Sequence, residues 1–263
     1  MVFGISTASF YPQLTELTLQ QFAHRQMKCC EVFFNTLSEI RPEYVEELAR
    51  IASAAGIFIP SAHPFTCAFE PFMLFTGYER RFQDALEWHR HYFDAMNRLG
   101  AGIFVFHGDR HGSPLPDEEY FCRFARLQEL GREYGIVVAQ ENVSRCRSGS
   151  LDFLCRMRDY LGSRAAFVFD NKQAVRSGVE TADYFRELGK NVVHVHISDH
   201  AGDQDCMPLR EDSPVIADLL LQLKQFDYSG AVVIELYGEQ LAEMECVYTS
   251  LQRLIETASR LQL

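Results

Sequence analysis

Eight short apolar segments recur along the 263-residue chain, and a segment with helical spacing follows each of them. The apolar segments are Val2–Ser6, Cys29–Phe34, Ile57–Ile59, Gly102–Phe106, Ile136–Ala139, Ala165–Phe169, Val192–Val195 and Ala231–Ile234. Most of them are continuously hydrophobic rather than alternating, which is typical of parallel strands that are covered on both faces. Eight such strands, each followed by a helix, predict an α/β fold of the (β/α)8 TIM barrel type.

The segments between these strands favour a single barrel. Four glycines, which commonly end helices, stand just before an expected strand: Gly56, Gly100, Gly135 and Gly162. The chain is close to the roughly 250 residues of one such barrel, so we expect a single domain over residues 1–263. An open doubly wound sheet is the alternative, but residues 6–12 lack the glycine-rich turn that usually follows its first strand.

Composition and charge restrict the class of partner. The chain is 47% hydrophobic and 23% charged, which is ordinary for a globular enzyme. Its formal net charge of −11 disfavours nucleic acid or an anionic membrane as a partner. No apolar stretch approaches the roughly 20 residues of a membrane-spanning helix. The eight cysteines form no CxxC pair and no secretory signal is recognised, so we expect free thiols in a cytoplasmic protein.

Polar side chains follow nearly every expected strand, at the end where the active sites of barrels lie. One at a time, such residues are more often helix caps or structural groups than ligands. Four of them follow the last four strands and would meet at one point of the barrel mouth: Glu141, Asp170, His196 and Glu235. Clustered carboxylates repel one another unless a cation neutralises them, so we expect one divalent metal here. Oxygen-rich ligation with one imidazole favours Mn²⁺, Mg²⁺ or Co²⁺, and Zn²⁺ can also bind such a set.

Several short motifs occur in the order found in a known group of proteins. They are Ser61-Ala62-His63, Phe106-His107-Gly108, Gln140-Glu141-Asn142, Phe169-Asp170, His194-Val195-His196-Ile197-Ser198-Asp199 and Val233-Ile234-Glu235-Leu236. Over essentially the whole chain, the sequence resembles the sugar phosphate isomerase/epimerase family of xylose-isomerase-like TIM barrels, within the AP endonuclease family 2 superfamily. That group also includes ketose 3-epimerases, inosose dehydratase and endonuclease IV. The motifs are specific for the superfamily and not for one substrate.

The resemblance implies a metal-dependent sugar isomerase or epimerase that acts on a ketose or a related polyol. The metal-binding positions of the family correspond here to Glu141, Asp170, His196 and Glu235. The resemblance also makes Glu141 and Glu235 the catalytic acid and base. One would remove the proton next to the substrate carbonyl, the metal would stabilise the enediolate, and the other would return a proton. His63 and His107 would contact substrate hydroxyls, and Asp199 would orient a metal-binding group.

Two positions near the expected site depart from the family pattern, and two charged side chains there have two possible roles each. Gln173 stands where many members carry a histidine, and it can bind a substrate hydroxyl but is a poor metal ligand. The segment 207–212 lacks the glycines that many members have there, and its Arg210 can bind a substrate carboxylate or phosphate or lie in solvent. Lys172 is either a cation in the pocket or an exposed lysine, and exposure is favoured.

Other functions stay open at this point. A dehydratase (a lyase) of the inosose dehydratase type would begin with the same proton removal and then expel a β-hydroxyl. An endonuclease IV-like DNA repair nuclease would use His63 and His107 as metal ligands, but Gln173, the lack of an Asp-x-His motif in residues 201–214 and the acidic charge oppose it. A non-catalytic sugar-binding protein is opposed by the intact ligand set. We therefore expect a small sugar or polyol as the partner, no nucleic acid and no membrane, with a homo-oligomer compatible with the fold.

Overall fold

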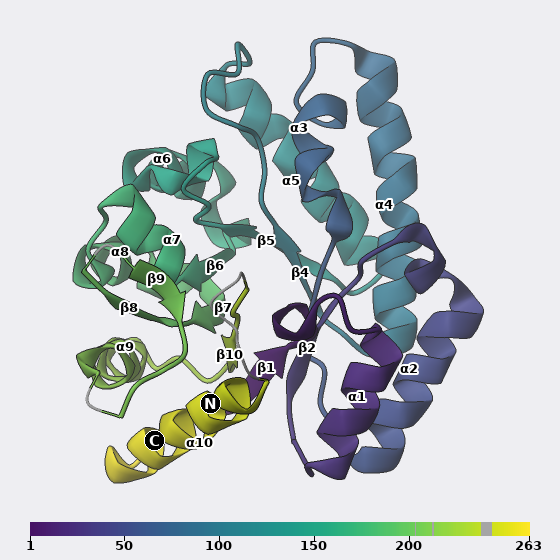
Figure 1. Ribbon diagram of the computed structural model, residues 1–263. Coiled ribbons are helices and arrows are strands. Elements are labelled where there is room, and N and C mark those ends of the chain that lie inside the picture. Colours follow the sequence, from purple (N-terminus) through teal and green to yellow (C-terminus); the bar gives the residue numbers. More distant parts are fainter. Residues whose placement is uncertain (203, 212, 238–243) are drawn as a thin grey trace.

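A closed barrel of eight parallel strands forms the centre of the molecule, in a computed structural model that describes residues 1–202, 204–211, 213–237 and 244–263 (Figure 1). The barrel strands are β1 (Val2–Ser6), β2 (Cys30–Phe33), β3 (Ser61–His63), β4 (Ile103–Phe106), β5 (Val137–Glu141), β6 (Phe167–Asp170), β7 (Val192–Ile197) and β10 (Ala231–Ile234). Each strand pairs with the next along the chain, and β10 pairs with β1 to close the barrel. The predicted (β/α)8 fold is confirmed.

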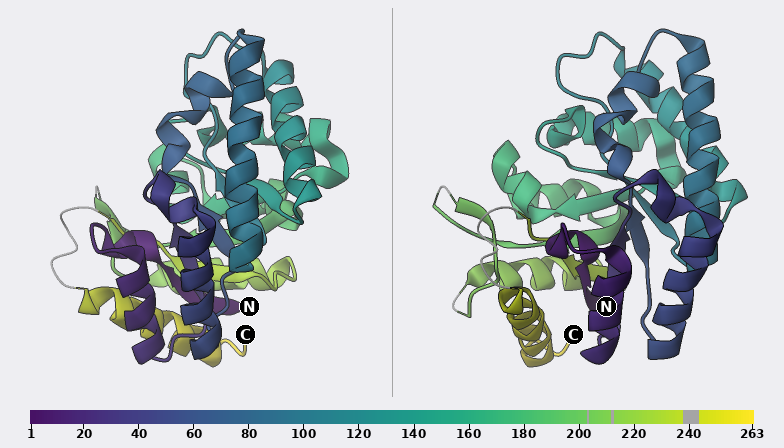
Figure 2. Two further views of the ribbon diagram at one scale, coloured as in Figure 1. Left: turned by 90° about the vertical axis from the view of Figure 1, so that its right-hand side faces the viewer. Right: turned by 45° about the vertical axis from the view of Figure 1, so that its right-hand side comes forward.

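Helices cover the outside of the barrel. They are α1 (Thr15–His24), α2 (Pro42–Ala55), α3 (Glu70–Met73), α4 (Glu79–Leu99), α5 (Asp117–Glu133), α6 (Leu151–Leu161), α7 (Asn171–Ser177), α8 (Thr181–Leu188), α9 (Pro214–Gln225) and α10 (Glu245–Arg260). On one side α1 packs on α2, α2 on α4, and α4 on α5 (Figure 2). The last helix, α10, packs against β1 and α9, so the two ends of the chain lie near each other (Figure 1).

Glycine ends two of the long helices as the sequence predicts. Gly56 follows α2 with φ of 66°, and Gly100 follows α4 with φ of 81°, and both have the left-handed conformation. A residue with a Cβ is strained in this conformation, which explains why glycine stands where the chain must turn from a helix into the next strand.

The third strand lies later in the chain than the apolar pattern predicts. We expected it at Ile57–Ile59, but β3 comprises Ser61–His63. Phe58 forms only an isolated bridge, and its side chain is 53% exposed. Pro60 has no N–H to donate to a ladder and separates the two segments. The polar residues Ser61 and His63 are nevertheless buried, because they face the interior of the barrel mouth.

A small antiparallel hairpin interrupts the connection between β7 and α9. It is formed by β8 (Asp199–Ala201) and β9 (Gln204–Met207), and the apolar pattern does not predict it. All eight cysteines are free, as expected. No helix in the described ranges has both the length and the apolar character needed to cross a membrane.

Candidate metal centre

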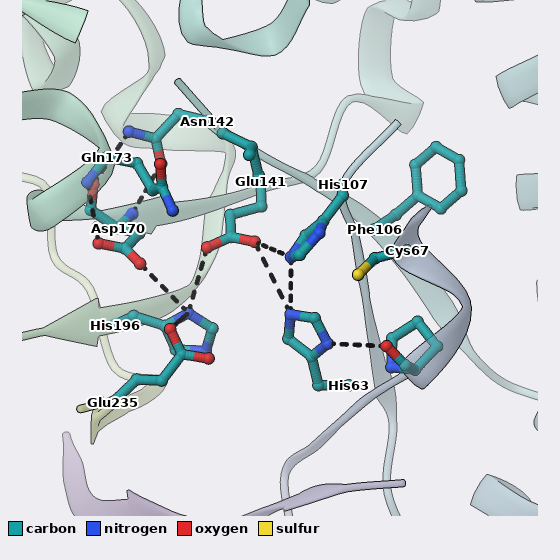
Figure 3. Close-up of polar contacts among 12 residues, drawn as sticks. His63, Cys67, Phe106, His107, Glu141, Asn142, Asp170, Gln173, His196 and Glu235 are labelled. Atoms are coloured by element: carbon teal, nitrogen blue, oxygen red, sulfur yellow. Dashed lines mark hydrogen bonds and ion pairs between the residues drawn. The ribbon is translucent and has the colours of Figure 1, made fainter. Parts of the chain in front are cut away.

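Four side chains from the last four barrel strands meet at one point in the barrel mouth (Figure 3). They are the four that the sequence analysis selected: Glu141, Asp170, His196 and Glu235. All four are buried, and one ligand atom of each lies within 4.8 Å of the ligand atoms of the others. His196 Nδ1 is central, at 3.5 Å from Glu141 Oε1, 3.9 Å from Asp170 Oδ2 and 3.8 Å from Glu235 Oε2.

The chemistry of this cluster fits a divalent cation. Within the part of the chain that the structure describes, His196 Nδ1 is a buried nitrogen without a hydrogen-bond partner. Leaving such an atom unpaired is costly, as is crowding three carboxylates where little water can screen them. A cation bound by the nitrogen and the carboxylate oxygens removes both costs. The residues present therefore suit the metal that the sequence predicts.

Burial and the crowded charges shift the pKa values of the cluster residues. Burial raises the pKa of Asp170 to about 6; the nearby Lys172 opposes this rise, and the carboxylate of Glu141 adds to it. Burial lowers the pKa of His196, but the carboxylates of Glu31 and Glu235 outweigh burial and raise it well above its ordinary value. A metal that binds to His196 Nδ1 must therefore displace a proton.

Glu31 of β2 contacts the ring nitrogen of His196 that does not face the cluster. Its Oε2 lies 3.0 Å from His196 Nε2 and 3.1 Å from His194 Nε2, and it accepts a 2.9 Å hydrogen bond from Ser61 Oγ. When Nε2 of His196 donates to this carboxylate, its Nδ1 faces the cluster as a potential ligand. Sequence reasoning placed Glu31 in a strand but gave it no role. Glu31, His194 and His196 also form a group close enough to hold a metal.

Lys172 is buried, so the prediction that it is exposed is wrong. It lies in the first turn of α7 and is 1% exposed. Its Nζ forms ion pairs with Asp170 Oδ2 and, at 2.8 Å, with Glu235 Oε2. These two carboxylates offset the cost of burying an ammonium group, which sequence spacing alone cannot reveal. Burial lowers the pKa of Lys172, but Asp170 and Glu235 raise it well above its usual value.

A cavity of about 390 Å³ opens over the cluster, which is within the range of small-molecule sites. Among the four cluster residues, Glu141 and Glu235 line the cavity. Its wall also includes the aromatic rings of Tyr11, Phe33 and Phe65. Such a wall suits the carbon face of a sugar ring.

His63 and His107, for which the resemblance implies contacts with substrate hydroxyls, also line the cavity. His107 Nε2 lies 2.9 Å from Glu141 Oε2 and 2.8 Å from His63 Nε2 (Figure 3). Arg145 Nη2 lies 3.2 Å from His107 Nδ1, and His63 Nδ1 lies 3.2 Å from the carbonyl oxygen of Pro64. Because Arg145 can only donate, His107 Nδ1 accepts and its Nε2 carries the proton that faces Glu141. With Glu141, the two histidines form a further group close enough to hold a metal.

Gln173 is a wall residue of the cavity. Its Oε1 accepts hydrogen bonds from the backbone N–H of Ser144 at 3.0 Å and from Ser144 Oγ at 2.9 Å. This arrangement fixes the amide group and leaves its nitrogen as the donor for a bound molecule. Arg145, which also lines the cavity, was missed by sequence reasoning, although it follows Glu141 by only four residues.

Asp199 and Arg210 lie apart from this cavity. Arg210 Nε lies 3.0 Å from Asp199 Oδ2, and Asp199 Oδ1 accepts a 2.7 Å hydrogen bond from Ser213 Oγ. Neither residue is part of the cavity lining. Asp199 begins the hairpin of β8 and β9, and Arg210 follows that hairpin. Asp212, in the same glycine-poor segment, lies outside the described residues.

Asparagine side chains join neighbouring strand ends beneath the site. Asn142 Oδ1 accepts a 2.7 Å hydrogen bond from the backbone N–H of Asp170, and Asn142 Nδ2 donates to the Asp170 carbonyl oxygen at 3.0 Å. Asn171 makes the same pair of contacts with Ser198, at 2.9 and 2.8 Å. These contacts fix the backbone from which the carboxylate of Asp170 and the ammonium of Lys172 extend.

Comparison with known proteins gives the relationship of the whole chain. The model of a family described as xylose isomerase-like TIM barrel matches residues 21–258. A D-tagatose 3-epimerase-like protein superposes with a TM-score of 0.81 at 18% identity, covering 100% of this chain and 98% of its own. A D-psicose 3-epimerase in the presence of D-fructose gives 0.74 at 12% identity, with coverages of 99% and 98%. The probable 3-DHS dehydratase involved in petrobactin synthesis from Bacillus anthracis gives 0.74 at 17% identity, with coverages of 97% and 99%. At these identities the structures show a shared fold, and no curated protein sequence matches the chain.

Proposed function

The chain belongs to the xylose isomerase-like TIM barrel family, and we propose that it is a divalent-metal-dependent sugar isomerase or epimerase. One observation carries this proposal. Glu141 and Glu235 belong to the four-residue cluster and also line the cavity, so both carboxylates can contact a bound molecule. Two carboxylates that reach one bound carbon skeleton from different strands are suited to removing a proton and returning one.

The cation would be held by Glu141, Asp170, His196 Nδ1 and Glu235. When bound, it supplies Lewis-acid polarisation of a substrate oxygen. Three carboxylates and one imidazole favour Mn²⁺, Mg²⁺ or Co²⁺, and Zn²⁺ can also bind them. Glu31 would keep Nδ1 of His196 turned toward the cation through its contact with Nε2.

We assign proton transfer to Glu141 and Glu235. Burial raises the pKa of Glu141, but His107, His196 and His63 together outweigh burial and hold it well below its usual range. Burial also raises the pKa of Glu235, but Lys172 and His196 outweigh this and lower it. Both side chains are therefore carboxylates at neutral pH, and either can act as the base. The glutamate on the other side must be protonated to act as the acid; the Nε2 proton of neutral His107 donates a hydrogen bond to Glu141 and is not itself transferred.

The other residues that line the cavity would position the substrate. His63, His107 and Gln173 offer hydrogen-bonding groups for hydroxyls around the cavity, and the aromatic rings would help a bound sugar to displace water. Excluding water strengthens the electrostatic contacts of the buried carboxylates and protects a carbanion-like intermediate from side reactions. A hydroxylated carbonyl compound of the size of a ketose suits this arrangement.

A dehydratase on the same site is the second candidate. The observation that favours it is the shared fold with the probable 3-DHS dehydratase, which is as similar in TM-score as the D-psicose 3-epimerase. Both reactions start with removal of a proton next to a carbonyl, and they differ in whether a β-hydroxyl group then leaves. Loss of water from the substrate would identify the dehydratase.

Product analysis tests the proposal. The purified protein is incubated with a panel of ketoses, keto-sugars and cyclic polyols, with Mn²⁺ and with EDTA, and products are identified by chromatography and mass spectrometry. We expect an isomer of unchanged mass that forms with Mn²⁺ and not with EDTA. Glu141→Gln and Glu235→Gln should each abolish it, whereas Glu256→Gln, on the exposed side of α10, should not. Full turnover by both cluster variants would contradict the acid–base assignment.

A further inference from the structure

We infer that Lys172 is a built-in counter-ion of the carboxylate cluster, and that a divalent cation binds there against the lysine ammonium group. The inference concerns the metal affinity of the site and rests on the proposed function, because it takes Asp170 and Glu235 as metal ligands. It assigns a specific effect to a residue that the family pattern does not explain.

The ammonium group contacts the same oxygens that a cation would use. Lys172 Nζ pairs with Asp170 Oδ2 and lies 2.8 Å from Glu235 Oε2. These oxygens are also the ones that face His196 Nδ1, at 3.9 and 3.8 Å. Half of the expected donor set is therefore already engaged with a positive charge when no metal is bound.

The position of the ammonium group is fixed by the fold. Asp170 caps the first turn of α7 by accepting a hydrogen bond from the backbone N–H of Gln173, so the backbone of Lys172 is held between these residues. Asn171 ties the same turn to Ser198 beyond β7. The side chain of Lys172 is 1% exposed, and its ammonium group lies 5.0 Å from the centre of the Tyr237 ring.

The charges predict two opposite effects of this group. The ammonium group offsets about one of the negative charges of the three carboxylates before any metal binds. In the metal-free protein it lowers the repulsion among the carboxylates and so stabilises the assembled site. In the metal-bound protein it lies close to a second cation and lowers the affinity for that cation, because little water is present to screen the repulsion.

A counter-ion role and a purely structural role predict opposite changes in metal affinity when Lys172 is replaced. If Lys172 only oriented Asp170 and Glu235, its removal would leave the ligands misplaced and weaken metal binding. If it is a counter-ion, its removal strengthens metal binding while it destabilises the metal-free protein. A substitution that keeps the length of the side chain and removes the charge separates the two.

The test compares wild-type protein with Lys172→Met and with Lys190→Met, an exposed lysine between α8 and β7 that serves as the control. The dissociation constant for Mn²⁺ is measured from free Mn²⁺ by electron paramagnetic resonance, and the melting temperature is measured in EDTA and in saturating Mn²⁺. For Lys172→Met we expect a dissociation constant lower by about ten-fold or more. We also expect a lower melting temperature in EDTA and a larger rise on adding Mn²⁺. Lys190→Met should match the wild type in all three.

Equal or weaker Mn²⁺ binding by folded Lys172→Met, alongside binding by the wild type, would overturn the counter-ion role and leave the proposed function intact. Binding by the variant alone would support the role and show that the ammonium group blocks the site. Absence of binding in both would overturn this inference and the metal-dependent function together. If Lys172→Met does not fold in EDTA, Lys172→Gln is measured in the same way, with the same expected direction.

Discussion

Replacing Glu31 by glutamine tests whether this residue orients His196 for metal binding, because the change removes none of the four proposed ligands. Glu31 is fully buried, and its Oε2 lies within 3.1 Å of His196 Nε2, His194 Nε2 and Ser61 Oγ. Glutamine keeps the shape of the side chain but loses the charge and brings an N–H₂ group among donors. The proton on His196 is then no longer directed to Nε2, so Nδ1 is less often available to a metal.

The contacts of Glu31 set the expected losses of metal affinity and of stability. Loss of a carboxylate that holds a metal-binding histidine typically weakens metal affinity by about 10- to 100-fold. Glu31 takes part in three contacts, and hydrogen bonds to a charged group contribute about 1.5–3 kcal/mol each. Glutamine retains an acceptor for part of them, so we expect the free energy of unfolding in EDTA to fall by about 3 kcal/mol.

The assays are a Mn²⁺ titration and urea unfolding monitored by circular dichroism, with Glu256→Gln as the exposed control. Glu31→Gln should weaken Mn²⁺ binding, whereas Lys172→Met should strengthen it, so the two variants move the same quantity in opposite directions. Mn²⁺ affinity within two-fold of the wild type, together with unchanged unfolding, would refute the idea that Glu31 orients His196.

Three further perturbations have definite expected outcomes. Because the pKa of Asp170 is raised to about 6, its carboxylate gains a proton as the pH falls through 6, and Mn²⁺ affinity measured by calorimetry should drop there and recover on returning to higher pH. Asn142→Ala removes two hydrogen bonds to the backbone of Asp170 and should weaken Mn²⁺ binding while lowering the free energy of unfolding by about 1–3 kcal/mol in a urea titration. Phe104→Ala empties a fully buried position against the ring of Phe93 and should cost about 3–5 kcal/mol of stability without changing Mn²⁺ affinity in the remaining folded protein.

The barrel could be predicted from the sequence because its strands are covered on both faces and are therefore continuously apolar. The predicted bounds of β1 and β10 agree with the structure residue by residue. The prediction failed at β3, because polar residues occupy that strand where it faces the barrel mouth. The hairpin of β8 and β9 was missed because it is short and lacks an apolar face.

The cluster itself could be predicted because each member lies at or next to the carboxyl end of a strand, and in a parallel barrel these ends meet at one mouth. The side chains that support the cluster could not be predicted in this way. Glu31 and His194 meet across a separation of 163 residues, and such pairs leave no local pattern. Lys172 lies only two residues from Asp170, yet its burial depends on Glu235, which is 63 residues away.

Deuterium incorporation tests the central claim most directly, namely that Glu141 and Glu235 exchange a carbon-bound proton of a sugar at a divalent-metal site. The protein is incubated in D₂O with each ketose of the panel, with Mn²⁺ or with EDTA, and the recovered sugars are analysed by NMR and mass spectrometry. We expect deuterium at the carbon next to the carbonyl, with Mn²⁺ only, and little or none with Glu141→Gln or Glu235→Gln. Exchange that persists in EDTA or in both variants would contradict the claim, as would no exchange of any panel sugar by the Mn²⁺-loaded protein.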